Sequence, residues 1–131
     1  MVKFNQTVFF GLLPILKKYL EGQVVTLEKI DEAERIIDSH MGKGIFNREG
    51  WEYILTEHDG RLPIEIKAVK EGSVVGVSNA LITIENTDPN CFWLTNYLES
   101  LILQVWYPIT VATLSRECKK LIKQFVKECD F

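Results

Sequence analysis

The chain has 131 residues, a formal net charge of −3 and 47% hydrophobic residues. This length is typical of one domain and allows a core without disulfide bonds. The acidic balance argues against a dedicated nucleic-acid-binding protein, since such proteins usually carry a basic surplus. The hydrophobic content is high for a small soluble protein, so we expect another chain, or a missing part of this one, to cover some of its apolar surface.

The cysteines are odd in number and none forms a CxxC pair: Cys91, Cys118 and Cys129. This spacing does not favour a structural zinc site, and it suits a reduced, cytoplasmic compartment. The N-terminus shows no signal-peptide pattern. Residues 92–114 are long enough to suggest a membrane span, but polar residues and Pro108 interrupt them, so we expect no membrane segment.

The first three predicted elements are helices. Asn5 is expected to cap a helix that runs to about Leu20 and is kinked by Pro14, which cannot donate a backbone hydrogen bond. Thr26 and Asn47 are predicted to cap the next two helices, over residues 27 to about 40 and 48 to about 58.

The apolar period then changes from 3.6 to 2, which predicts strands over residues 62–68, 73–77 and 80–85. Two or three short strands leave both edges of a sheet open. We therefore expect an α+β fold in which helices pack on a small, incomplete antiparallel or mixed sheet. The sheet would be completed from outside the 131 residues, which would form a single partial domain.

The most apolar stretch, Leu81 to Arg116, is expected to dominate the core. Asp88 should cap a helix whose first residue is Pro89 and which runs to about Trp106. Pro108 should then start a further helix that reaches about Glu128.

Several polar groups are candidates for chemistry. A basic stripe on the last helix could bind phosphate, although such a stripe is more often a solvated helix face; it comprises Arg116, Lys119, Lys120, Lys123 and Lys127. His40 and His58 fall near helix ends, where a surface position is the simpler interpretation, because a catalytic base would need a partner that the sequence does not reveal. Cys91 lies near a helix N-terminus, which can lower a thiol pKa, but it has no assignable histidine.

Three acids lie near strand ends and could meet in space to do acid–base work or hold Mg²⁺: Glu65, Glu85 and Asp88. The sequence does not show that they meet. It contains no glycine-rich phosphate loop. No motif carries a self-sufficient active site.

Five runs give the chain a resemblance to the nicotinamide phosphoribosyltransferase family: TVFFGLLPILKKYL (7–20), VVTLEKIDEAE (24–34), FNREGWEYIL (46–55), DGRLPIEIKAVKEG (59–72) and ENTDPNCFWLTNYLESLILQVWYPITVATLSRE (85–117). The last run is the most specific. The resemblance covers essentially the whole chain but only an early part of the family's sequence. It implies the non-barrel lobe of a type II phosphoribosyltransferase.

The resemblance also implies an activity for the complete enzyme: transfer of phosphoribose from phosphoribosyl pyrophosphate to nicotinamide, with Mg²⁺, in a dimer with sites at the subunit interface. The family's catalytic and substrate-binding residues lie beyond Phe131, so none is assigned to a position here. We expect this chain to bind no cofactor itself and to work in a homo-oligomer or with a barrel-bearing chain.

Three interpretations stay open. The chain could be an N-terminal part of such an enzyme, inactive alone. It could be a free-standing interaction module that associates with a phosphoribosyltransferase. It could also be a small enzyme that uses the three acids.

Overall fold

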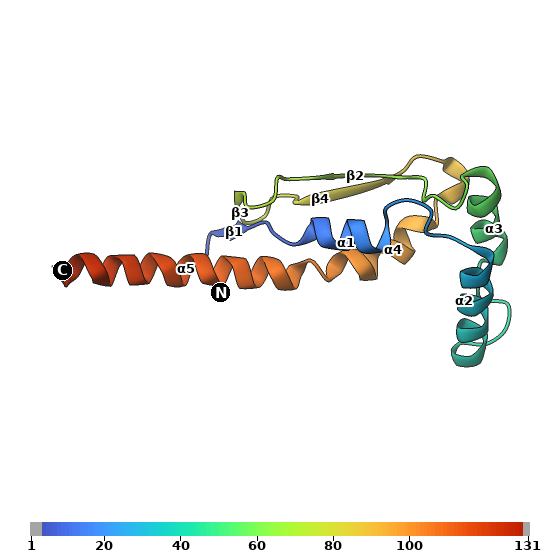
Figure 1. Ribbon diagram of the computed structural model, residues 1–131, viewed down its shortest axis with the longest axis horizontal. Helices are drawn as coiled ribbons and strands as arrows, with labels where there is room; N and C mark the ends of the chain where they lie inside the picture. The colour runs from blue at the N-terminus through green and yellow to red at the C-terminus, as the bar shows by residue number, and fades with distance from the viewer. Residues whose placement is uncertain (1–3, 130–131) are drawn as a thin grey trace.

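The computed structural model describes residues 4–129 and shows an elongated α+β arrangement, which confirms the predicted fold class (Figure 1). Its elements in chain order are β1 (Gln6–Val8), α1 (Leu12–Tyr19), α2 (Leu27–His40), α3 (Arg48–Glu57), β2 (Ile64–Ala68), β3 (Val74–Gly76), β4 (Ile82–Asn86), a 3-10 turn η1 (Pro89–Cys91), α4 (Leu94–Leu103) and α5 (Trp106–Glu128).

The strands form two separate antiparallel pairs rather than one sheet. β1 pairs with β3, with Thr7 opposite Val75, and β2 pairs with β4, with Ile66 opposite Ile84. Each pair is short, so its backbone edges stay open within the described residues, as the pattern of strands predicted.

The helix predicted from Asn5 is wrong before residue 12. Thr7 and Val8 pair with β3, and Gly11 has a φ of 98° that ends the extended segment before α1 begins. Tertiary pairing therefore overrides the helical spacing of the apolar residues. Pro14 becomes the third residue of α1, in the first turn, where its missing N–H breaks no helical hydrogen bond. The kink was expected because Pro14 would lie inside a longer helix, and that condition does not hold.

The predictions for α2 and α3 are confirmed, including their caps. The Thr26 hydroxyl accepts the N–H of Lys29 at 3.4 Å, and the Asn47 side chain accepts the N–H of Gly50 at 3.2 Å. The guanidinium of Arg48, at the start of α3, then ties the two helices together. It reaches three carboxylates at 2.6–2.8 Å, those of Asp31, Glu34 and Glu52.

The apolar stretch after β4 breaks into three pieces instead of the predicted continuous helix. Asp88 does act as a cap, but of the short η1 turn, and α4 begins only at Leu94. α4 is the central core helix, because Leu94 and Leu98 lie in one buried cluster and Ile102 lies in a second cluster with Phe9 and Leu12. Pro108 is the third residue of α5, close to the predicted start of that helix.

As expected, the same stretch supplies much of the buried core, but it is not buried throughout. Trp106 is 61% exposed and Tyr107 is 64% exposed. α5 extends well beyond the rest of the molecule (Figure 1). Among residues 4–129, no helix combines the length and the apolar character needed to cross a membrane.

Candidate functional site

Two of the three candidate acids meet on the β2–β4 ladder. Glu65 lies directly opposite Glu85, and both carboxylates face the ammonium of Lys67, at 2.9 Å and 4.0 Å respectively. Like charges that face each other across a ladder destabilise it, and Lys67 offsets that repulsion. All three side chains are more than half exposed. This is a solvated ion group on a sheet face rather than a sequestered acid–base pair.

Asp88 does not join these acids. It lies in the turn after β4, and its side chain meets His58, which follows the last residue of α3. The His58 Nε2 atom is 2.8 Å from the Asp88 Oδ2 atom, and the Tyr53 hydroxyl donates to the same oxygen at 3.0 Å. The other oxygen, Oδ1, accepts the backbone N–H of Asn90 at 2.9 Å. The Asn90 side-chain amide donates in turn to the Tyr53 hydroxyl at 3.0 Å. Sequence reasoning missed this polar cluster.

The cluster holds its carboxylate charged. The backbone N–H of Asn90 and then the His58 hydrogen bond lower the pKa of Asp88 below its ordinary value. For Tyr53, the Asn90 hydrogen bond favours the phenolate, but the hydrogen bond to Asp88 and burial outweigh it, so the pKa of Tyr53 is raised. At neutral pH, therefore, the Asp88 carboxyl group is ionised and the Tyr53 hydroxyl group keeps its proton.

Cys91 lies beside this cluster, but its chemistry differs from the expectation for a helix N-terminus. Its side chain is fully buried, and burial, followed by the negative charge of Asp88, raises the pKa of the thiol. A thiol nucleophile needs the opposite shift. The thiol therefore stays protonated and serves as a small core residue.

His58, Asp88 and Cys91 offer donor atoms that all lie within 4.8 Å of one another. Nitrogen, oxygen and sulfur donors together suit zinc. However, both Asp88 oxygens already accept hydrogen bonds, one from Asn90 and the other from His58 and Tyr53. These bonds account for the cluster as a clamp between the end of α3 and the turn after β4.

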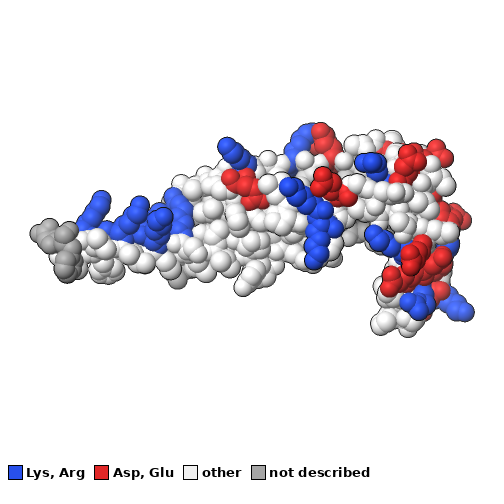
Figure 2. Space-filling view, viewed as in Figure 1, with Lys and Arg blue, Asp and Glu red and all other residues white. Residues whose placement is uncertain are grey.

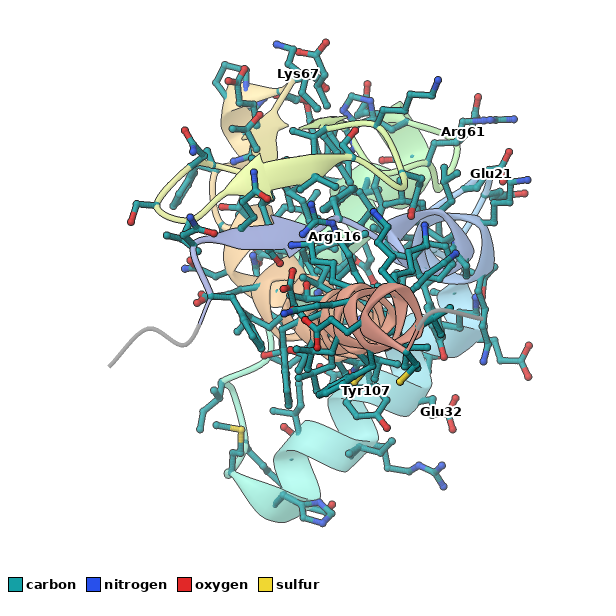
Figure 3. All side chains as sticks on the ribbon, turned by 90° about the vertical axis from the view of Figure 1, so that its left-hand side faces the viewer. Glu21, Glu32, Arg61, Lys67, Tyr107 and Arg116 are labelled. Atoms are coloured by element: carbon teal, nitrogen blue, oxygen red, sulfur yellow. The ribbon has the colours of Figure 1, made fainter. Side chains whose placement is uncertain are left out.

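The basic stripe is partly used within the molecule. Arg116 donates to Glu117 at 2.7 Å and to Gln6 of β1 at 3.2 Å, and Lys120 also reaches Glu117 at 2.7 Å. Figure 3, which looks along α5 from its C-terminal end, shows Arg116 and Tyr107 on opposite sides of the helix. The stripe is therefore one face of an amphipathic helix, and its internal ion pairs favour the solvated-face interpretation over a phosphate site.

His40 lies at the exposed end of α2, as the simpler interpretation held. Its Nδ1 atom is 2.9 Å from the Ile36 carbonyl oxygen and 2.9 Å from the Ser39 hydroxyl. These are neighbours on its own helix. His40 is thus a helix-end residue.

An apolar groove of about 490 Å³ lies between β4, α4 and the start of α5. Apolar side chains make up most of its lining, including Ile84, Ile102 and the exposed Trp106. Thr95, Asn96 and Glu99 are its polar members on α4. A groove so poor in reactive groups suits burial against another protein surface better than chemistry.

Comparison with known proteins identifies the family. The sequence model described as the N-terminal domain of nicotinamide phosphoribosyltransferase matches residues 1–66. The chain is also 46% identical, over 124 residues, to a nicotinamide phosphoribosyltransferase of Xanthomonas campestris pv. campestris (strain 8004), which covers 95% of the chain and 26% of that relative.

A second relative, the nicotinamide phosphoribosyltransferase of Acinetobacter baylyi, is 34% identical over 131 residues, which is 92% of the chain and 25% of the relative. The chain thus spans about a quarter of the length of the curated relatives that it matches. Because the family model covers just over half of the chain and both matches run through nearly all of it, the chain belongs to the nicotinamide phosphoribosyltransferase family.

Proposed function

We propose that this chain forms an N-terminal lobe of a nicotinamide phosphoribosyltransferase. The complete enzyme would join nicotinamide to phosphoribosyl pyrophosphate, giving nicotinamide mononucleotide and pyrophosphate in cytoplasmic NAD salvage. The 131 residues alone would be inactive. They would act structurally, with a barrel-bearing chain or within a homo-oligomer.

One observation carries this proposal: the match to the Xanthomonas relative spans 95% of this chain but only 26% of the relative. The relative has about three quarters of its length outside the match. The exposed apolar groove beside Trp106 gives that remainder a surface to pack against.

The three candidate acids do not fit the magnesium ion that the reaction implies. Mg²⁺ prefers carboxylate oxygens free to complete an octahedral shell. The Glu65 and Glu85 carboxylates already face the Lys67 ammonium, and both Asp88 oxygens accept hydrogen bonds. We therefore place Mg²⁺ and phosphoribosyl pyrophosphate on the rest of the complete enzyme, and we route no chemical step through these residues.

The test is an assay for nicotinamide mononucleotide formation. The purified chain would be assayed alone and together with the remaining three quarters of the Xanthomonas relative. We expect no turnover by the chain alone and measurable turnover by the mixture. Turnover by the isolated chain would contradict its inactivity, and a bound but inactive mixture would contradict a complementing role.

A matched pair of variants sharpens the assay. Trp106→Asp places a charge in the apolar groove and should abolish complementation, because a buried unpaired carboxylate is strongly unfavourable. Lys123→Gln changes an exposed position on the basic face and should keep complementation within a few-fold. Equal loss in both variants would mean that the groove is not the docking surface.

The exposed groove also favours the alternative that the chain is an interaction module, which would bind the intact Xanthomonas enzyme rather than its C-terminal remainder. Binding isotherms against both proteins separate the two ideas. Tight binding to the intact enzyme alone would support the module.

A further inference from the structure

Three kinds of donor atom converge where the end of α3 meets the turn after β4. We define the donor triad as His58, Asp88 and Cys91. It offers one imidazole nitrogen, one carboxylate oxygen and one thiol sulfur, and these atoms all lie within 4.8 Å of one another. The two segments that carry them lie side by side at one end of the molecule (Figure 1). The fold assembles the triad, because His58 and Asp88 are 30 positions apart in the sequence.

Local structure holds each donor in place. His58 follows the last residue of α3, and its backbone N–H still donates to the Ile54 carbonyl at 3.2 Å. Asp88 and Cys91 lie at the two ends of the η1 turn, and the Cys91 N–H donates to the Asp88 carbonyl at 2.9 Å. Since a 3-10 turn has three residues per turn, it brings side chains three positions apart to the same side. The donors are therefore positioned by the fold before an ion arrives.

The hydrogen bonds of the clamp at Asp88 suit the outer shell of a metal ion. A carboxylate has about four lone-pair positions, and the Asp88 carboxylate uses three of them for hydrogen bonds. Only one of the three, the bond from His58, joins two members of the triad, so an ion would replace that bond alone. The bonds from the Tyr53 hydroxyl and the Asn90 N–H would stay and orient the carboxylate, as outer partners do in metal sites.

The donor types select the class of ion. Nitrogen and sulfur donors favour zinc, whereas Mg²⁺ and Ca²⁺ take oxygen ligands. Charge agrees with this choice, because the Asp88 carboxylate and a Cys91 thiolate together balance a divalent ion, and a neutral imidazole adds no charge. Such a balanced group costs far less to bury than an isolated thiolate. The buried thiol would therefore give up its proton only as the ion binds.

Solvent reaches the triad from the histidine side. The side chain of His58 is 29% exposed, that of Asp88 is 14% exposed, and Cys91 is fully buried. Zinc usually takes four ligands, and the triad supplies three of them. A water molecule at the His58 side would complete the set. The cysteine spacing did not favour a zinc site because it was judged for cysteine ligands alone, whereas the triad needs one cysteine.

We propose that the donor triad binds one Zn²⁺ ion, with water as the fourth ligand, and that the ion fastens the end of α3 to the turn after β4. On binding, the ion exchanges water ligands for the three donor atoms, and the proton of the Cys91 thiol passes to solvent. The proposal does not depend on the phosphoribosyltransferase function. Its tests use no enzyme assay, so the two proposals fail separately.

The first test is a metal titration of the metal-free chain with Cys118→Ser and Cys129→Ser, in which Cys91 is the remaining cysteine. Cd²⁺ is the optical probe, because a cadmium–thiolate bond absorbs in the ultraviolet by charge transfer. The band should reach its plateau at one equivalent, and excess Mg²⁺ should leave it unchanged. A chain that gives no band, or a band that Mg²⁺ removes, would overturn the proposal.

Isothermal titration calorimetry then measures Zn²⁺ itself, which should bind at one ion per chain with a Kd of about 1 µM or lower. A matched pair of variants identifies the nitrogen donor. His58→Gln removes the imidazole, but its amide can still donate to Asp88 and keep the clamp. It should weaken Zn²⁺ binding at least about 100-fold, more than the loss of an outer partner usually does. His40→Gln, at the exposed end of α2, should bind like the parent chain. Equal affinities of the two variants would rule out His58 as a ligand.

The third test measures stability, since an ion that binds only the folded chain must raise its unfolding temperature. Zn²⁺ should raise the Tm of the parent chain, and a chelator should reverse the shift. Cys91→Ala should show no shift, with circular dichroism confirming that it folds; His58→Gln gives the same measurement if it does not. A shift as large in these variants as in the parent chain would contradict the proposed site.

Discussion

The carboxylate of Glu71 accepts the backbone N–H of Gly11 at 2.8 Å, across 60 positions of the sequence. It also accepts the N–H groups of Leu12 and Leu13 at 2.9 Å and 3.0 Å. α1 has no side-chain cap of its own, so an acid from the turn before β3 satisfies the free donors at its N-terminus. The turn and the helix therefore depend on each other.

Removal of that carboxylate should destabilise the domain. We expect Glu71→Ala to lower the free energy of unfolding by about 1–2 kcal/mol, the usual effect of losing a helix cap with its favourable charge. Glu71→Gln keeps an acceptor and should lose less. Urea unfolding measures both, and Glu21→Ala at the other end of α1 is the control. Equal stability of Glu71→Ala and wild type would show that water replaces the cap.

Gly11 should tolerate no side chain, for two reasons that can be separated. Its φ of 98° strains any other residue, and an added Cβ would lie only 2.5 Å from the Pro108 Cγ atom. Gly22 shares a positive φ, 79°, but an added Cβ there meets nothing within 4 Å. We expect Gly22→Ala to lower the free energy of unfolding by about 1 kcal/mol from strain, and Gly11→Ala to lower it by about 3 kcal/mol or more. Similar losses would mean that α5 shifts to make room.

Acid should destabilise the domain partly through Asp88. Because folding lowers the pKa of this carboxyl below 3.8, its stabilising effect is complete well above pH 3.8 and is lost as the pH falls through the lower, folded-state value. Asp88→Asn should be less stable than wild type at pH 7, and the gap should shrink as the pH falls below about 3.8. Unfolding midpoints against pH measure this. Asp59→Asn is the control, and a gap that does not change with pH would contradict the prediction.

The three thiols should differ sharply in reactivity towards a disulfide reagent. Cys118 and Cys129 are exposed, whereas Cys91 is buried and burial raises the pKa of its thiol. We expect two thiols to react quickly in dilute native protein and Cys91 to react only when the fold opens, at least about 100-fold more slowly. Fast labelling of all three would mean that the clamp at Asp88 opens freely.

Local signals predicted α2 and α3 well, because each has a capping residue next to a regular apolar face: Thr26 for α2 and Asn47 for α3. The helix predicted over residues 6–8 was wrong, because their strand conformation depends on β3, almost 70 positions later, and on Thr113 of α5. The same limit applies to the cluster at Asp88. His58 follows a helix and Asp88 precedes a turn, so each was recognised as a terminal residue, but nothing local indicated that the two ends meet.

The apolar content indicated that another surface covers part of the chain, and the exposed groove beside Trp106 and the exposed apolar side chains of α5 agree with that expectation. It could not locate the surface. The segment that contains Trp106 and Tyr107 was expected to dominate the core, yet both residues, which follow the end of α4, are exposed. Only the path of the backbone decides which side of such a segment remains open.

Acidic side chains gather over α2 and α3 at one end of the molecule, and cations lie along the projecting half of α5 at the other (Figure 2). Such a separation gives the chain a large electric dipole moment along its long axis. Approaching molecules would be rotated before they touch, and two copies would meet head to tail more often than chance allows. That guidance weakens beyond roughly 8 Å at physiological ionic strength, so added salt should slow encounter more than it speeds separation.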